Sequence, residues 1–104
     1  MTQDERIMYN KAINTIDYKI ILRTHCIAEP TMEQLRAMQL AVHAMEEKMK
    51  ETGKDLSRHI AVLNYHLAQP TALLFKDRHT IDAMTAGIYA IKWLLGGKES
   101  VVKG

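Results

Sequence analysis

The chain has too few cysteines for an internal disulfide. Cys26 is the only cysteine among 104 residues, whereas small domains held together by disulfides carry several. The N-terminal stretch MTQDERIMYNK is polar and charged and lacks the apolar segment of an export signal. Both observations predict a protein that resides in the reducing environment of the cytoplasm.

Long apolar runs and blocks of one charge are also missing. The most apolar stretch, residues 80–97, is interrupted by Asp82 and Lys92, whereas a transmembrane helix needs about 20 consecutive apolar residues. We therefore expect no association with a membrane. The 14 basic and 12 acidic residues are interspersed and give a net charge of +2. This composition does not provide the basic arm that is typical of nucleic-acid-binding proteins.

Residues that break helices are scarce, and those present separate four segments with helical periodicity. The chain has two prolines, Pro30 and Pro70, and Gly53 lies between them. We expect helices over residues 2 to about 23–25, 31–52, from 55 through 67, and from 77–80 to 96. Apolar residues recur in each segment at steps of three and four positions, which places them on one helix face. These residues are Tyr9, Ile13, Ile16 and Ile20; Leu35, Met38, Val42, Met45 and Met49; Leu56, Ile60, Leu63 and Leu67; and Ile81, Met84, Ile88, Ile91 and Leu95.

Several local signals mark the ends of these helices. Residues 2–5 (TQDE) and 31–34 (TMEQ) have the pattern of a capping box, in which the first and fourth residues exchange hydrogen bonds. Gly53 suits the left-handed position that follows a helix, and Asp55 can cap the next helix. Because the link between these two helices is short, we expect them to pack antiparallel.

The predicted fold is all-α: an antiparallel helical bundle of about four helices in one domain, residues 1–97, followed by a tail, residues 98–104. Seams with a period near 3.5 favour helices packed at about 20°. A helical pair that completes its core only by dimerisation would use the same seams and remains the alternative. We expect the apolar residues Leu73, Leu74 and Phe75 to close one end of the bundle.

The last predicted helix carries the features that most suggest a binding surface. Ala83, Gly87 and Ala90 form a stripe of small residues beside the apolar seam. Glycine within a helix costs about 1 kcal/mol relative to alanine, so Gly87 indicates close approach by another backbone. That backbone belongs either to another helix of the same chain or to a partner. Tyr89 and Trp93 favour the partner, since aromatic residues are enriched at interface hot spots.

Basic residues suggest a second kind of site. Lys19 and Arg23 share a helix face, and Lys76, Arg78 and His79 precede or begin the last helix. If the two groups converge, they form a modest anion-binding surface, to which the helix N-terminus adds its dipole.

Signals for catalysis or for a cofactor are weak. A carboxylate-bridged metal site in a bundle uses Glu-x-x-His on two helices, and the sequence contains none. A set made of His43, Glu46, Glu47, His59 and His66 is the only metal hypothesis, and its spacings are common by chance. The chain has no glycine-rich phosphate loop, and no pair of acids stands out as an acid–base couple. His25 beside Cys26 is not a catalytic pair by adjacency alone. We therefore expect neither an enzyme nor a cofactor or metal site.

The functional hypothesis is a small non-enzymatic helical protein that binds another macromolecule as an adaptor, inhibitor or regulator and forms a homo-oligomer. Its interface would include Ala83, Gly87, Tyr89, Ala90 and Trp93. The alternative is an anion-binding module for a nucleotide or nucleic acid.

Overall fold

The computed structural model describes residues 2–21, 31–69 and 78–96, with residues 18–21 described by their backbone only. These ranges contain helices and no strand, which confirms the predicted all-α class. The four helices are α1 (Gln3–Ile21), α2 (Met32–Thr52), α3 (Ser57–Ala68) and α4 (Arg78–Leu95). None of the described helices is long and apolar enough to cross a membrane. Leu73, Leu74 and Phe75, like the tail 98–104, lie outside the described residues.

The helix ends follow the predicted capping signals closely. At the start of α1, Glu5 N–H donates to Thr2 Oγ1 (3.2 Å) and Thr2 N–H donates to Glu5 Oε1 (2.8 Å). Thr31 and Gln34 exchange the same pair of bonds at the start of α2. Gly53 ends α2 with φ 76°, in the left-handed region that glycine enters without steric cost.

The start of α3 differs slightly from the prediction. Leu56 occupies the cap position in place of Asp55. The Asp55 carboxylate still accepts hydrogen bonds from the Ser57 hydroxyl and from the Ser57 backbone N–H at 3.1 Å. These bonds stabilise the charged form and lower the pKa of Asp55 below its ordinary value.

The apolar faces predicted from the residue spacing form the core. Every described member of the four series is buried or half-buried, and the largest fully buried side chains include Met38, Met45, Leu63, Met84 and Ile91. Alanines add a second set of core residues that the spacing did not single out: Ala12, Ala37, Ala41 and Ala44. The core therefore combines bulky side chains with positions at which helix backbones come close together.

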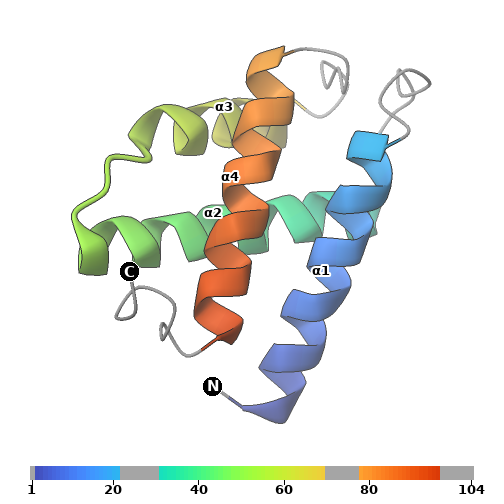
Figure 1. The fold of residues 1–104 in the computed structure, drawn as a ribbon. Coiled ribbons are helices and arrows are strands. Elements are labelled where there is room, and N and C mark those ends of the chain that lie inside the picture. The colour runs from blue at the N-terminus through green and yellow to red at the C-terminus, as the bar shows by residue number, and fades with distance from the viewer. Residues whose placement is uncertain (1, 22–30, 70–77, 97–104) are drawn as a thin grey trace.

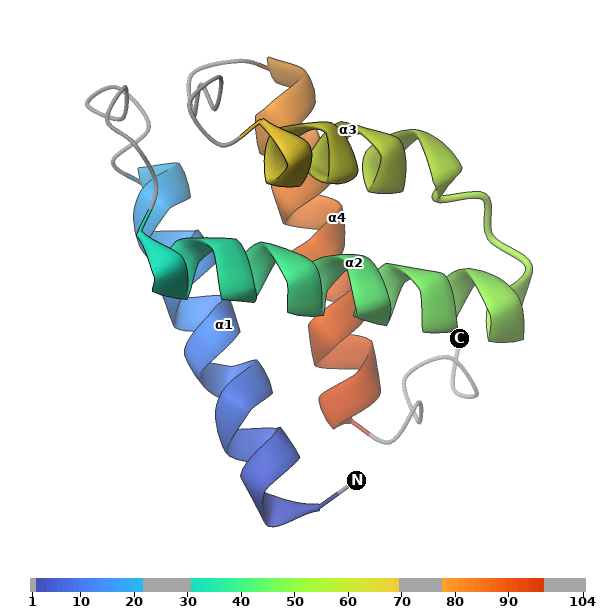
Figure 2. The same ribbon diagram turned by 180° about the vertical axis from the view of Figure 1, so that it is seen from behind.

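The helices form two antiparallel pairs that cross each other. Figure 1 shows α1 and α4 side by side and running in opposite directions, with α2 passing across both. The reverse view in Figure 2 shows the same crossing and places α3 alongside α2 in the opposite direction, as the short link predicted. Arg6 donates a hydrogen bond to the carbonyl oxygen of Leu95 (3.0 Å), which joins the start of α1 to the end of α4.

Near-parallel packing was expected for all helices. The structure differs from this expectation between α2 and the α1–α4 pair, since α2 crosses both helices steeply (Figure 1). Small residues at the crossing are the physical reason. A Cβ atom added to Gly87 would lie 2.7 Å from the Cβ of Ala41, so the backbones of α4 and α2 approach more closely than bulky seam residues allow. The two helices therefore pack around this close contact, and their apolar seams do not lie alongside each other over their full length.

Candidate functional site

The small-residue stripe of α4 faces the interior of the chain. Ala83 and Ala90 are 0% exposed, and Gly87 is buried against Ala41 of α2. Of the two interpretations of Gly87, the structure supports the crossing of helices within one chain. Ala83, Gly87 and Ala90 therefore do not lie on the surface of this fold, although all three were predicted as interface residues.

The two aromatic residues of α4 have different environments. Tyr89 is 60% exposed, whereas Trp93 is only 5% exposed. The Lys92 ammonium lies 6.0 Å from the centre of the Tyr89 ring, within the range of a weak cation–π interaction at an exposed site. Among the predicted interface residues, Tyr89 is therefore the one whose side chain is exposed and can contact a partner. Trp93 is buried next to it on the same helix.

Tyr89 and Trp93 line an open groove of about 810 Å³, which we call the α4 groove. Its base is one face of α4, and its wall is the hairpin end formed by α2, α3 and their link, which extends past one side of α4 in Figure 1. The described residues that line the α4 groove are Lys48, Lys54, His59, Asp82, Thr85, Ala86, Tyr89, Lys92, Trp93 and Gly96.

Positive charge predominates in the α4 groove. Lys48 comes from α2, Lys54 from the link and Lys92 from α4. Asp82 is the single acid among the described lining residues, and its carboxylate already has Arg78 as a neighbour at 3.5 Å. The α4 groove is therefore suited to a ligand that carries negative charge.

Lys48 is the most constrained of these lysines. It is half-buried near the end of α2. Burial lowers the pKa of Lys48 below its ordinary value, and the positive charge of Lys54 lowers it further. Both effects disfavour the protonated form of Lys48, and an anion bound beside it would favour that form.

The structure describes only part of the predicted anion-binding site. Arg78 and His79 are exposed in the first turn of α4, and Arg78 pairs with Asp82. Arg23 and Lys76 lie outside the described residues, as does the side chain of Lys19. The convergence of the two predicted groups therefore stays a prediction, and the cationic site that the structure does contain is made of other lysines.

The histidines occupy unrelated positions. His43 is exposed on α2, and His59 lines the α4 groove. His66 is buried, and its Nε2 atom lies 2.8 Å from the hydroxyl of the buried Thr80, which links the end of α3 to the start of α4. In the described part of the chain, no three His, Cys, Asp or Glu side chains come together as a metal site would require. The metal hypothesis built on His43, Glu46, Glu47, His59 and His66 thus receives no support.

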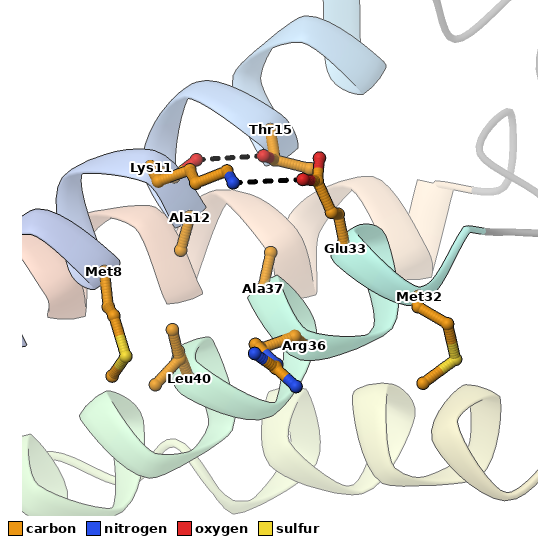
Figure 3. A pocket seen from close by; sticks show the side chains of 9 residues that line it. All are labelled: Met8, Lys11, Ala12, Thr15, Met32, Glu33, Arg36, Ala37 and Leu40. Atoms are coloured by element: carbon orange, nitrogen blue, oxygen red, sulfur yellow. Dashed lines mark hydrogen bonds and ion pairs between the residues drawn. The ribbon is translucent and has the colours of Figure 1, made fainter.

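A second depression, of about 290 Å³, lies between α1 and α2. Figure 3 shows Met8 and Leu40 on one side of it and Met32 on the other, with Ala12 and Ala37 between the helices. Lys11 and Glu33 form an ion pair across the two helices at 3.0 Å, with both side chains mostly exposed. Exposed ion pairs contribute at most about 1 kcal/mol, so this pocket combines apolar surface with a weak, balanced charge pair.

Sequence reasoning missed the cationic groove because its lysines are distant in the chain. Lys48 and Lys54 lie 38 or more residues before Lys92, and only the crossing of α4 over the α2–α3 hairpin brings the three regions together. The interspersed charge pattern gave no signal of this cluster.

A comparison of the chain with family models, curated proteins and solved structures finds no significant match to any of them.

Proposed function

We propose that this chain is a non-enzymatic binding protein that recognises a segment of another protein in the α4 groove, as an adaptor, inhibitor or regulator. The observation that supports this proposal most directly is Tyr89, which is 60% exposed beside an open groove. An amphipathic aromatic ring contributes a large contact area at a low cost in conformational entropy. Trp93 lies one turn further along the same face of α4.

The charge of the α4 groove favours a different protein over a second copy as its occupant. In a two-fold symmetric dimer the same patch of both copies meets. Contact through this face would bring Lys48, Lys54 and Lys92 of one copy near the same lysines of the other, and juxtaposed like charges cost several kcal/mol. Homo-oligomerisation, including completion of the core by dimerisation, stays a prediction, and we expect any such interface to use another surface.

Native mass spectrometry of protein purified gently from its own source tests the proposal. We expect a retained protein partner that is lost on Tyr89→Ala and kept on Tyr65→Ala. Tyr65 is a matched control, since it is 53% exposed and lies on α3 outside the lining of the α4 groove. A bare monomer would contradict the proposal, and so would a partner whose retention is unaffected by Tyr89→Ala. The same spectra report the oligomeric state directly.

The second candidate function is an anion-binding module for a nucleotide or nucleic acid, and the lysines of the α4 groove are the observation that favours it. Neutralising several phosphates would make the affinity fall steeply with salt. The test is the binding of a single-stranded oligothymidylate or of ATP at low and moderate salt. No retention at low salt would exclude this candidate.

A further inference from the structure

Three lysines from separate parts of the fold line one groove around an exposed aromatic ring. Lys48 and Lys92 lie on α2 and α4, Lys54 lies on the link, and the exposed Tyr89 lines the same groove. Lysines that only solubilise a protein tend to extend into water away from one another. Here Lys48 is half-buried and close enough to Lys54 to interact electrostatically with it.

We propose that the α4 groove recognises an acidic segment of a protein, with carboxylates placed among Lys48, Lys54 and Lys92 and a neighbouring apolar side chain packed on Tyr89. This inference rests on the proposed function and adds the chemistry of the partner. Charge complementarity supports it, because Asp82, the one acid among the described lining residues, already has Arg78 beside it. Bound carboxylates would accept charge-assisted hydrogen bonds from the ammonium groups.

The lining of the groove favours a peptide over a nucleic-acid strand. A nucleic acid needs a track of cations that follows its phosphates, whereas the described lining of this groove contains three lysines and no arginine. Ala86, Trp93 and Gly96 also line the groove and provide apolar surface next to the cations. A segment that alternates carboxylates with apolar side chains matches both parts of this surface.

The state of Lys48 in the free protein supports the same conclusion. Because burial and Lys54 disfavour its charged form, the pKa of Lys48 lies below its ordinary value. A carboxylate beside it favours the charged form and would raise that pKa again. Binding of an acidic segment is therefore expected to shift the titration of Lys48 upward, a change that a purely structural lysine would not show.

The test uses the full chain and the fluorescein-labelled peptide EEDLFEED, with binding followed by fluorescence anisotropy at low salt. Lys48→Gln should weaken binding about tenfold, the loss expected for a charge-assisted hydrogen bond. Lys50→Gln is the matched control: Lys50 is exposed on the last turn of the same helix and lies outside the groove lining, so its replacement should change the affinity less than about twofold. The peptide KKNLFKKN should not bind.

Three further measurements separate recognition from general electrostatics and from a loss of folding. Peptide-induced NMR shifts should gather on α4 around Ala86, Tyr89 and Lys92, and the pKa of Lys48 should rise when EEDLFEED is added. Lys48→Gln should leave the urea unfolding midpoint unchanged or raise it, because it removes a half-buried charge close to that of Lys54.

Three results would overturn the inference: no binding of EEDLFEED at low salt, equal losses for Lys48→Gln and Lys50→Gln, or tighter binding of oligothymidylate than of the peptide. These results can be told apart from failure of the proposed function. If a protein partner is retained in a Tyr89-dependent manner while EEDLFEED does not bind, the groove binds protein but does not select acidic segments. If no Tyr89-dependent partner is found, the proposed function itself fails.

Discussion

Adding one methyl group at the crossing of α2 and α4 should destabilise the fold, although the same change stabilises most helices. Gly87 lies within α4, where alanine is favoured over glycine by about 1 kcal/mol. The new Cβ atom would lie 2.7 Å from the Cβ of Ala41, whereas two carbon atoms prefer a separation of about 3.5–4.0 Å. Neither methyl group can rotate away, so the two helices must separate.

The size of the loss follows from two opposing terms. Overpacking a well-packed core costs about 1–3 kcal/mol, and this separation also loosens contacts at Ala83 and Ala90, which are fully buried on the same side of α4. The gain in helix propensity offsets about 1 kcal/mol of this cost. Since the two colliding atoms are Cβ atoms fixed to helix backbones, we take the upper part of the overpacking range, about 2–3 kcal/mol. We therefore expect Gly87→Ala to lower the free energy of unfolding by about 1–2 kcal/mol, and each kcal/mol corresponds to about 4–8 °C in Tm for a domain of this size.

Urea unfolding followed by circular dichroism measures this change, and a compensating variant identifies its cause. In Gly87→Ala combined with Ala41→Gly, the nearest remaining atom of residue 41 is its Cα at 3.7 Å, an ordinary contact. The double variant should thus be more stable than the sum of its single changes predicts. Ala61→Gly, at an exposed position of α3, measures the propensity term alone. A Gly87→Ala protein as stable as the wild type, or strictly additive changes in the double variant, would refute the close crossing.

Three other predictions concern single side chains. Thr31→Ala removes the capping box of α2 and should lower the free energy of unfolding by about 1 kcal/mol; a thermal melt without any shift would contradict it. Thr80→Val removes the buried hydrogen bond to His66 and should cost about 1–3 kcal/mol. Thr85→Val, which loses only a bond to a carbonyl of its own helix, should cost less in the same urea titration. Burial raises the pKa of Tyr9 above 10.0, so stability is fully present below that pH and is lost as the pH rises through the higher folded value. Tyr9→Phe should reduce this alkaline loss, and equal losses in both proteins between pH 8 and pH 11 would show that the ring is not buried.

The helices and their buried faces could be predicted because both depend on short-range rules. Capping boxes involve residues three positions apart, and the spacing of Met38, Val42 and Met45 alone places them on one face. The burial of Met38, Val42 and Met45 confirms that inference. The crossing of the helix pairs depends instead on Ala41 meeting Gly87, and a single sequence does not record which small residues meet.

Only part of the candidate site could be predicted from the sequence, for the same reason. Tyr89 and Trp93 share a face of one helix, so their spacing alone pointed to the helix face that forms the base of the groove. The cations were predicted from residues close in sequence, such as Arg78 and His79, whereas Lys48 enters the groove from a different helix. Charge clusters created by tertiary packing have no counterpart in local charge patterns.

The position of α4 also determines when during synthesis this chain can fold. α4 contacts α1, α2 and α3, yet its residues are the last of the four helices to be translated. Until α4 emerges, the α2–α3 hairpin can form from contacts close in sequence, but Ala41 of α2 lacks its close contact with Gly87. The slow, long-range step is therefore the docking of α4, which closes the Arg6–Leu95 contact and creates the groove at the same moment. We therefore expect a nascent or truncated chain that lacks α4 to have an incomplete core and no α4 groove.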